Sequence, residues 1–467
     1  MEPAHGPGAP YRIPPPPRDE DNDLAGPLHA ERNQMLDIDL IRQDPRYVEE
    51  NLGRRRHPPY VALLHQVLEV DTEWRRLHGE ADRLRAQRNR LSQALARAHK
   101  SGTPPPEEVS REARELPAQI EAVESREKET ACTRDDLLRR LPNLLDPSVP
   151  FGTDDTGNVE VTRWGEPAEP GFPLRSHGDL AEAMGWAEFG QARDVSGAGF
   201  YYLLGDLALL DLALQRFAVD RLVQKGFVPV VPPYMLRREP YEGVTDLADF
   251  EKVMYRVEGE DLYLIATSEH PLAALYRGKI LEESSLPIRL AGISPCFRQE
   301  IGGHGVDQKG IFRVHQFSKV EQFVFCAPED SPGMHEELRA NAEEFFRALE
   351  IPYRVVNVCT GDLGVVAAKK YDIEAWFPRQ KAYREVVSCS NCTDYQARRL
   401  GIRMGKAGKP GKRVPHTLNS TEVATSRAMA VILEGGQAPD GTVRIPRVLV
   451  PYMGGRERLE PQNGIGH

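Results

Sequence analysis

Charged and aromatic side chains crowd two neighbouring segments, residues 297–300 and 311–325. A glycine-rich stretch, residues 302–310, joins them and predicts a hairpin with a long flexible loop. Strand side chains alternate between faces, so one face of each strand is expected to carry a charged ladder. The ladders consist of Arg298 and Glu300 on the first strand, and of Arg313, His315, Phe317, Lys319 and Glu321 on the second.

These residue types suit a phosphorylated ligand that contains a base. An arginine fork matches phosphate oxygens, an aromatic ring offers a platform for a base, and a carboxylate accepts from an amine. An exposed charged sheet face would explain the alternation but not this particular set. The sequence has neither a G-x-x-x-x-G-K-[ST] motif nor a dinucleotide-binding glycine fingerprint, so a nucleotide would be held in another way.

The sequence predicts a mixture of helices and strands for the elements that must position these side chains. Alternating runs predict strands at residues 227–231, 262–266, 311–325 and 384–389, and a helix over residues 206–225. One long hairpin dominates the pattern. We therefore expect an α+β fold over residues 151–467, with a largely antiparallel sheet flanked by helices.

A long helix is predicted ahead of this region, over residues 60–100, because apolar residues recur with heptad spacing. The seam consists of Leu63, Val67, Val70, Trp74, Leu77, Ala81, Leu84, Leu91 and Leu95, interrupted by Arg88. A Gly-Thr-Pro-Pro-Pro turn at residues 102–106 reverses the chain. A second helix, running to Leu141, would pack on the first as an antiparallel coiled-coil arm, and Pro117 should kink or delay it.

The distal half of this arm is basic, because residues 83–106 contain no Asp or Glu. Its cations are Arg83, Arg85, Arg88, Arg90, Arg97 and Lys100. The charges alone slightly favour a solvated helix face. An elongated arm with a basic end also suits a nucleic-acid backbone.

Length and composition limit the classes of protein that remain. With 467 residues, two domains are expected, and 40% hydrophobic with 28% charged residues is typical of a globular protein. No apolar run approaches the roughly 20 residues of a membrane span, and the first residues, acidic and rich in proline, lack the pattern of a secretion signal, so we expect a cytoplasmic protein without membrane contact. The net charge of −10 argues against a protein that coats nucleic acid generally.

Two further features concern the first residues and the cysteines. Residues 1–34 are rich in proline and acid and are expected to be a disordered extension, with Met35 an alternative start. Residues 35–150 then form the helical arm domain. The six cysteines are too few for a disulfide framework. Cys389 and Cys392 could be half of a zinc site, but no second ligand pair completes it, which favours free thiols.

The charged hairpin, with Phe297-Arg-Gln-Glu300 followed by Arg313-Val-His-Gln-Phe317, resembles motif 2 of the class II aminoacyl-tRNA synthetases. Its continuation, Ser-Lys-Val-Glu-Gln-Phe, is similar to the seryl-tRNA synthetases. Further segments agree in order: residues 226–233 resemble motif 1, 267–269 the serine-binding loop, 384–399 a segment of the same family and 418–427 motif 3. The resemblance runs from about Met35 to the C-terminal region.

The resemblance implies a role for each matching residue. Arg298 and Arg427 would be the catalytic pair, on the α-phosphate and the γ-phosphate of ATP. The implied ATP contacts are Arg298, Glu300, Arg313, Val314, Phe317, Glu385, Val386, Val387, Ser388 and Arg427. Glu385 and Ser388 would also meet the Mg²⁺ that accompanies ATP. The implied serine contacts are Thr267, Ser268, Glu269, Arg298, Glu321 and Thr421.

The resemblance also implies partners and a reaction. L-serine would be activated with ATP and Mg²⁺, without zinc, and transferred to tRNA(Ser); serylation of tRNA(Sec) is left open. Motif 1 with Pro233 implies a homodimer, and a sheet of about six strands is implied for the catalytic domain. The arm would hold the tRNA through Arg85, Arg88, Arg90 and Arg97.

Several alternatives remain open from the sequence. Asn419 and Glu422 could simply cap the helix that follows them, and Glu385 alone would more often be a solvated strand carboxylate. His304 and His315 receive no catalytic role, because adenylate formation needs alignment and charge stabilisation more than a base. Motif 3 lacks the usual glycines before Arg427, a departure that bears only on lineage.

Two rival functions are a ligase that loads a carrier protein and an inactive synthetase-like binding protein. The long arm argues against the first rival. The second should have lost Arg298, Glu300 or Arg427, and all three are present.

Overall fold

The computed structural model describes residues 37–167, 170–245, 251, 253–300, 310–406 and 408–462. The predictions for the extension at residues 1–34, for Met35, and for loop residues 302–309 with His304 lie outside these residues. The domain boundary expected near residue 150 stays a prediction. Within the described part of the chain, no helix is both long and apolar enough to cross a membrane.

Two short helices open the described chain, α1 (Ile38–Gln43) and α2 (Pro45–Gly53). Each begins at an aspartate whose side chain accepts a backbone N–H: Asp37 caps α1, and Asp44 caps α2 ahead of Pro45. Their apolar faces form a small core with the base of the arm. This base cluster contains Ile38, Ile41, Val48, Leu52, Leu63, Leu64, Val67, Leu138 and Leu141.

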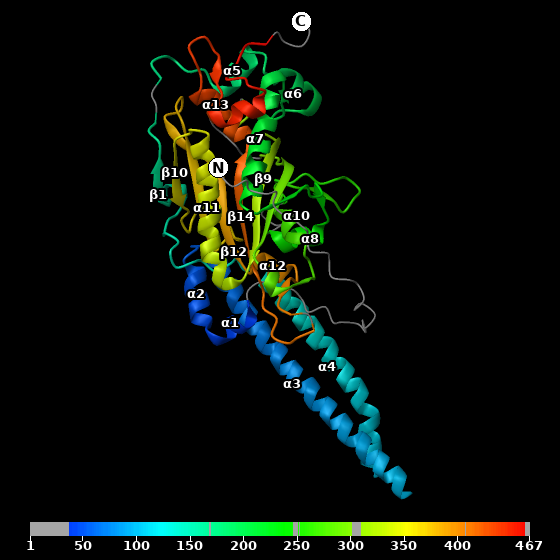
Figure 1. Cartoon of the computed structure of the whole chain (residues 1–467). Helices are drawn as coiled ribbons and strands as arrows, with labels where there is room; N and C mark the ends of the chain where they lie inside the picture. The colour runs from blue at the N-terminus through cyan, green and yellow to red at the C-terminus, as the bar shows by residue number, and fades with distance from the viewer. Residues whose placement is uncertain are drawn as a thin grey trace, which may run out of the picture. The chain divides into compact units, whose positions relative to one another are not determined.

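The predicted two-helix arm is confirmed. It consists of α3 (Pro58–Ser101) and α4 (Glu107–Arg139), which run side by side in Figure 1. Gly102 ends α3 in the left-handed region (φ 67°), where its N–H reaches the Ala98 and His99 carbonyls. The expected delay of the second helix is wrong, because α4 begins at Glu107 and continues through Pro117.

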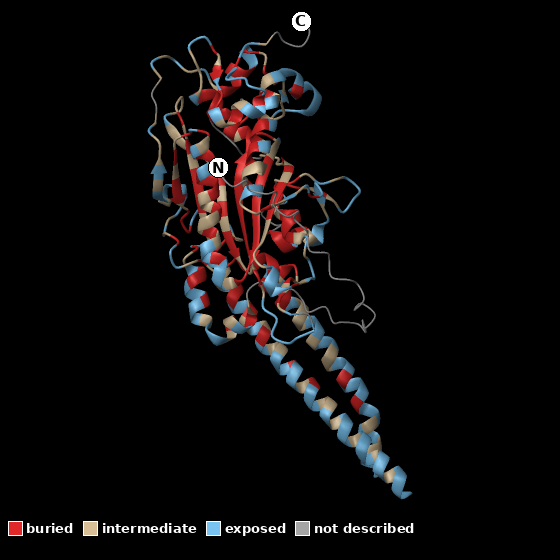
Figure 2. Ribbon diagram, in the orientation of Figure 1, coloured by how far each residue is buried: buried red, intermediate tan, exposed pale blue. Residues whose placement is uncertain are grey.

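Burial along the arm falls with distance from the sheet. Leu63, Val67, Leu77 and Ala81 are buried, whereas Leu84, Leu91 and Leu95 are only half-buried. Figure 2 shows the outer arm as mostly exposed. Arg88 is exposed rather than on the seam, because at that level the half-buried Gln87 turns toward α4 and donates to Glu112 Oε1 at 2.6 Å.

The second region is built on an eight-stranded sheet within the described residues, in the order β1-β10-β11-β12-β14-β9-β8-β4. All neighbours are antiparallel except the edge pair β4 and β8, which is parallel. The α+β class is confirmed, with more strands than the resemblance implied. Their bounds in this order are Val159–Trp164, Tyr353–Asn357, Lys369–Phe377, Ala382–Thr393, His416–Ala424, Gln316–Cys326, Ile288–Phe297 and Val228–Val230.

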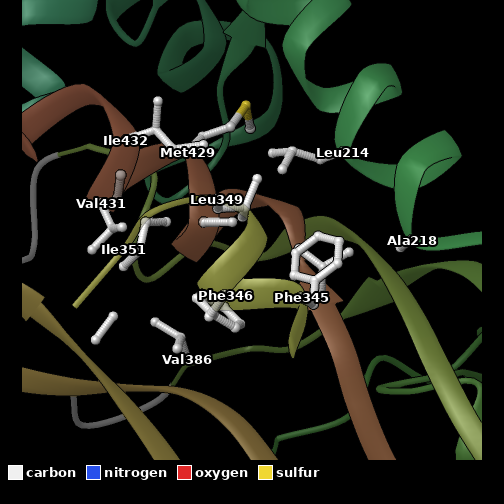
Figure 3. Packing of buried hydrophobic residues seen from close by; sticks show 14 of the residues in the cluster. Leu214, Ala218, Phe345, Phe346, Leu349, Ile351, Val386, Met429, Val431 and Ile432 are labelled. Atoms are coloured by element: carbon white, nitrogen blue, oxygen red, sulfur yellow. The ribbon is translucent and has the colours of Figure 1, made fainter. Parts of the chain in front are cut away.

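Three helices, α7 (Gly205–Gln224), α11 (Ser331–Ala348) and α13 (Thr425–Gly435), provide most of the helical side of the core. Figure 1 shows α11 lying over β12 and β14. The rings of Phe217 on α7 and Phe345 on α11 are 5.3 Å apart. Figure 3 shows Leu214 of α7, Phe346 of α11 and Met429 of α13 in the same apolar cluster.

Short elements complete the second region. The helices are α5 (His177–Ala183), α6 (Gly190–Ser196), α8 (Arg238–Val244), α10 (Glu269–Ala274) and α12 (Tyr395–Arg399). The strands are β2 (Ala187–Glu188), β3 (Tyr202–Leu203), β5 (Met235–Leu236), β6 (Tyr263–Leu264), β7 (Ile280–Leu281), β13 (Arg403–Met404), β15 (Val443–Arg444) and β16 (Arg458–Leu459). The strand predicted at residues 262–266 is therefore reduced to β6.

The arm base is joined to the sheet region through buried polar groups. Arg55, 8% exposed, donates to the carbonyls of Leu363 at 3.2 Å and Asn143 at 2.9 Å. Asn143 in turn donates to the Cys392 carbonyl at 2.8 Å. Burial lowers the pKa of Arg55 to about 10, so it is still charged at neutral pH. These bonds tie the start of α3 and the end of α4 to the sheet.

Candidate active site

The hairpin of β8 and β9 brings Arg298 beside Phe317. The guanidinium carbon of Arg298 lies 5.4 Å from the centroid of the Phe317 ring. The backbone N–H of Arg298 donates to the His315 carbonyl at 3.0 Å, and its Nε donates to the Ala266 carbonyl at 3.3 Å. An arginine held against an aromatic ring in this way can meet a phosphate while the ring meets a base.

The two charged ladders are shorter than the alternation predicted. β8 ends at Phe297, and Glu300 adopts a positive φ of 46°, so regular alternation stops before it. β9 begins at Gln316, so Arg313 and His315 precede the strand. The chain leaves the sheet here to form the connecting loop. Arg313 and Glu300 still meet, with Nη1 and Oε2 3.7 Å apart.

Arg427 at the start of α13 contacts the first half of β12. Its Nη1 donates to the Glu385 carbonyl at 2.9 Å and lies 3.2 Å from Glu385 Oε1. The guanidinium carbon is 5.2 Å from the centroid of the Phe312 ring. A backbone carbonyl, a carboxylate and a ring therefore fix this second arginine.

A β-bulge explains how β12 presents Glu385 and Ser388 together. The register with β11 shifts between Ile373 and Glu374, which inserts one extra residue in β12. Val386 and Val387 are consequently both buried in the apolar core. Glu385 and Ser388 are left on the opposite, polar face.

Two residues of β11 join that polar face. Asp372 pairs with Ser388 across the strands, and its Oδ2 lies 3.0 Å from Lys370 Nζ. Asp372 is 5% exposed, and its Oδ1 accepts no hydrogen bond from any described residue. Burial opposes ionisation of Glu385, but the charges of Arg427, Lys370 and Arg298 outweigh it and lower its pKa.

The second half of the site is a buried polar cluster around the start of α10. Thr267 and Ser268 are buried there, and Ser268 Oγ forms no hydrogen bond with any described residue. Gly292 on β8 leaves room for this segment, because a Cβ at that position would lie 2.4 Å from Ser268 Oγ. Gly292 pairs with Glu321 in the sheet, which places the segment containing Thr267 and Ser268 beside that residue.

Three charged side chains converge in this cluster, whose residues are Thr267, Ser268, Glu269, Lys319, Glu321 and Thr421. Lys319 Nζ donates to Thr267 Oγ1 at 3.1 Å and forms an ion pair with Glu321. Gln396 donates to Glu269 Oε1 at 2.7 Å. Thr421, 5% exposed, pairs with Glu321 across β14 and β9.

Burial dominates the acid strength of both carboxyl groups. Burial, followed by the charge of Glu321, raises the pKa of Glu269 to about 7. Burial also raises the pKa of Glu321, and the ammonium group of Lys319 opposes that shift. In this cluster Glu321 is therefore paired with Lys319, whereas the carboxyl group of Glu269 ionises near neutral pH.

The alternative in which Asn419 and Glu422 cap the following helix is wrong. The residue that caps α13 is Ala424, without a side-chain hydrogen bond. Asn419 Nδ2 instead donates to Cys392 Sγ at 3.5 Å. Glu422 is fully buried, and burial raises its pKa to about 8. Both side chains therefore lie buried in the interior of the sheet region.

The arm residues expected at the tRNA divide into two kinds. Arg85 is ion-paired, with Nε 2.9 Å from Glu124 on α4 and Nη1 2.9 Å from Asp82. Arg88, Arg90 and Arg97 are exposed. No residue in the described ranges forms an ion pair with any of these three.

Comparison with known proteins identifies the family. Residues 252–435 match the tRNA synthetase class II core domain (G, H, P, S and T), and residues 35–145 match the seryl-tRNA synthetase N-terminal domain. A serine–tRNA ligase from Methanocella arvoryzae is 56% identical over 426 residues, which are 91% of this chain and all of that relative. The chain belongs to the serine–tRNA ligase family.

Solved structures of this family agree with the fold. Seryl-tRNA synthetase from Pyrococcus horikoshii, complexed with ATP, has a TM-score of 0.88 at 49% identity, covering 92% of this chain and all of that one. Cytoplasmic serine–tRNA ligase from Naegleria fowleri, in complex with AMP, has a TM-score of 0.84 at 39% identity, with the same coverage. Family membership and the arrangement of helices and sheet are thus established together.

The sequence did not assign a role to two residues of the site, Lys319 and Asp372. Lys319 was placed on the right strand face, but its contact with Thr267 joins positions 52 residues apart. Asp372 carried no local signal at all. Only its pairing with Ser388 on the neighbouring strand brings it to the polar face.

The cysteines are all free, with Cys389 and Cys392 buried. In the described part of the chain, no group of three or more His, Cys, Asp or Glu side chains is arranged to hold a metal ion. Pro233 is exposed and follows β4.

Proposed function

We propose that this chain activates L-serine with ATP and transfers the seryl group to tRNA(Ser). The observation that carries the proposal is the continuity of two half-sites on one sheet face. Arg298 belongs to both, because it lies over Phe317 and contacts the carbonyl of Ala266. Ala266 directly precedes Thr267 in the polar cluster described above, which we call the serine pocket; it consists of Thr267, Ser268, Glu269, Lys319, Glu321 and Thr421. A nucleotide on the ring and an amino acid in the pocket would therefore share one arginine.

In the first step an oxygen of the serine carboxylate attacks the α-phosphorus of ATP, and the bond to pyrophosphate breaks. Arg298 would stabilise the charge that develops on the α-phosphate, and Arg427 would hold the γ-phosphate. Phe317 would stack on adenine, Glu300 would accept from its amino group, and Arg313 would lie at its edge. The backbone around Val314 and at Val386 and Val387 would border the nucleotide.

Mg²⁺ would enter with ATP, and the polar side chains in the first half of β12 and on the neighbouring β11 suit it. Oxygen donors are what this ion prefers, and Glu385, Ser388 and the unpartnered Oδ1 of Asp372 supply them. The ion would neutralise charge on the phosphates. Glu385 is kept ionised by Arg427 and Lys370, so it is ready to act as a ligand.

The serine pocket explains the choice of amino acid. The ammonium group of serine would meet Glu269 and the Thr267 hydroxyl, and its carboxylate would meet Arg298. Its hydroxyl would bond Glu321 and Thr421, with Ser268 at the wall. A site built to hydrogen-bond a hydroxyl rejects an analogue that lacks it, because buried polar groups are then left unpaired.

In the second step the terminal ribose hydroxyl of the tRNA takes the seryl group, and AMP leaves. The arm would hold the tRNA by its backbone through Arg88, Arg90 and Arg97, and Arg85 would contribute after leaving its partners on α4. Serylation of tRNA(Sec) stays a prediction that the same charging assay would check.

A homodimer belongs to the proposal as well. Apolar side chains stand exposed on α7 and in the segment after β4 that contains Pro233, among them Leu212 at 61% and Val231 at 67%. The others are Leu209, Val223, Tyr234 and Met235. An exposed apolar surface of this kind is typical of a subunit interface. A Val231→Asp variant should shift the mass measured by light scattering from dimer to monomer, and an unchanged mass would exclude this surface.

Serine-dependent exchange of pyrophosphate into ATP tests the main proposal. We expect rapid exchange with serine and far slower exchange with threonine, alanine, glycine and cysteine. Glu321→Ala should lose most with serine, because the hydroxyl then has no carboxylate partner. Exchange with another of these amino acids at least as fast as with serine would contradict the assignment.

A further inference from the structure

The cation at the centre of the serine pocket is a buried lysine. Lys319 is 7% exposed, two residues ahead of Glu321 on the same face of β9. Its ammonium group contacts two of the residues expected to bind serine, Thr267 at 3.1 Å and Glu321 through an ion pair. A buried lysine is unfavourable unless it is paired, so this position needs a reason.

The charges in the pocket supply one. Glu269 and Glu321 are both buried carboxyl groups, and the charge of Glu321 disfavours ionisation of Glu269. Both cannot be ionised in a dry pocket without compensating cations. Arg298 is one such cation, but it is held toward Phe317 and the Ala266 carbonyl. Lys319 is the cation that contacts Glu321 directly.

We propose that Lys319 is a positioning residue for serine selectivity: anchored on Thr267 and paired with Glu321, its ammonium group opposes protonation of the Glu321 carboxylate and directs that carboxylate toward the hydroxyl of the amino acid. The inference rests on the proposed function. Because Lys319 already neutralises Glu321, the ammonium group of the incoming serine is left to Glu269. The two carboxylates thereby take different parts of the same small substrate.

The groups that face Glu321 from the surrounding elements are few. β9 contributes Lys319, Arg298 follows β8, the buried thiol of Cys296 lies near the end of β8, and Glu269 lies at the start of α10. His270, the next residue of α10, is influenced by Lys319 and Arg298. Burial, with the charges of Lys319 and Arg298, lowers the pKa of His270 to about 3, so it stays neutral. Lys319 and Arg298 are therefore the charges that oppose the rise that burial causes in the pKa of Glu321.

The test replaces the lysine by an apolar residue of similar length, Lys319→Met, and compares serine with alanine in pyrophosphate exchange. We expect kcat/KM for serine to fall on the order of 100-fold while alanine changes by less than about threefold. The serine profile should also move to higher pH, because the uncompensated Glu321 binds a proton more tightly. Lys319→Arg, which keeps the charge, should recover part of the serine preference.

A matched control is Lys370→Met on the neighbouring polar face. Lys370 is also ion-paired to a carboxylate, with Nζ 3.0 Å from Asp372 Oδ2. Its loss should alter the dependence on ATP and Mg²⁺ but leave the ratio of serine to alanine unchanged. A folded Lys319→Met protein with the wild-type ratio and pH profile would overturn the inference and make Lys319 a structural residue only.

A second pair of variants covers the case in which Lys319→Met does not fold. Glu321→Gln removes the carboxylate and leaves the buried Lys319 ammonium without its ion-pair partner, whereas Glu321→Gln/Lys319→Met leaves neither charge of the pair. If Lys319 acts through Glu321, the second substitution should change serine kcat/KM by less than about threefold in this background. A further loss of 100-fold would overturn the proposed route. Failure of the wild type to prefer serine would instead contradict the proposed function itself.

Discussion

The polar face of the sheet and the outer arm both display arginines, but they hold them in opposite ways. On the sheet, Arg427 is fixed by the carbonyl and carboxylate of Glu385, and Arg298 by the Phe317 ring and the Ala266 carbonyl. On the arm, Arg88, Arg90 and Arg97 are exposed, without an ion-pair partner in the described ranges.

The difference matches the two tasks that the proposal assigns. Charge that develops during adenylate formation is stabilised best by cations already held in place and shielded from water. A tRNA backbone is held by many exposed cations whose binding releases counterions, and fixed geometry matters less. Arg85 belongs to neither kind, because Glu124 and Asp82 engage it and thereby tie α3 to α4.

The largest effect is expected on the sheet. Arg298→Ala should reduce serine-dependent pyrophosphate exchange by about 10²–10³-fold, because a preorganised charge is removed from the α-phosphate. Aminoacylation should fall in parallel, since both need the adenylate. Arg427→Ala should act in the same direction. Circular dichroism and dimer mass serve as controls for the fold.

An Arg298→Ala protein with wild-type exchange rates would show that the nucleotide does not bind at Phe317. Arg298 would then be an ordinary surface cation, and the contrast with the arm would disappear.

A smaller and differently distributed effect is expected on the arm. Replacing Arg88, Arg90 and Arg97 by Gln should raise the KM for tRNA about tenfold or more and leave serine-dependent exchange unchanged. The dependence of log affinity on log salt should flatten by about one unit for each phosphate group that the variant no longer neutralises. Arg76→Gln is the matched control, because Arg76 on α3 is paired with Glu73 and Glu80. An unchanged KM at low and high salt would make these three arginines a solvated surface.

The smallest effect concerns pH and the serine pocket. The pKa of Glu269 near 7 means that its carboxyl is mostly protonated at pH 6 and mostly ionised at pH 8. An ammonium group binds the ionised form, so kcat/KM for serine should rise about tenfold over that interval. Glu269→Gln should lower kcat/KM and flatten this limb. A wild-type profile that falls with pH over the same interval would contradict Glu269 as the ammonium partner.

Local patterns were enough to predict much of the molecule. The heptad seam predicted α3, and the alternation along residues 316–321 put Phe317, Lys319 and Glu321 on one face. Both signals repeat over several turns or residues and depend little on distant parts of the chain. The resemblance added the reaction and the residue roles, which periodicity alone does not contain.

Long-range pairing accounts for what was missed. Arg85 looked free in a run without acids, but its partner Glu124 comes from α4. The strand position of Arg313 and His315 was wrong, because nothing local marks where β9 begins. The bulge that exposes Glu385 with Ser388 depends on register with β11, and so does the position of Asp372.

The division of labour between sheet and arm is tested most directly by shortening the arm. Removing residues 88–115 and closing the gap with a short glycine-rich turn keeps the base cluster and the ion pair between Arg85 and Glu124. Serine-dependent pyrophosphate exchange should stay within about twofold of the wild type, because the arm contributes nothing to the serine and ATP half-sites. Aminoacylation, measured as kcat/KM for tRNA, should fall at least about 100-fold. Equal losses in both assays, or undiminished aminoacylation, would contradict the account.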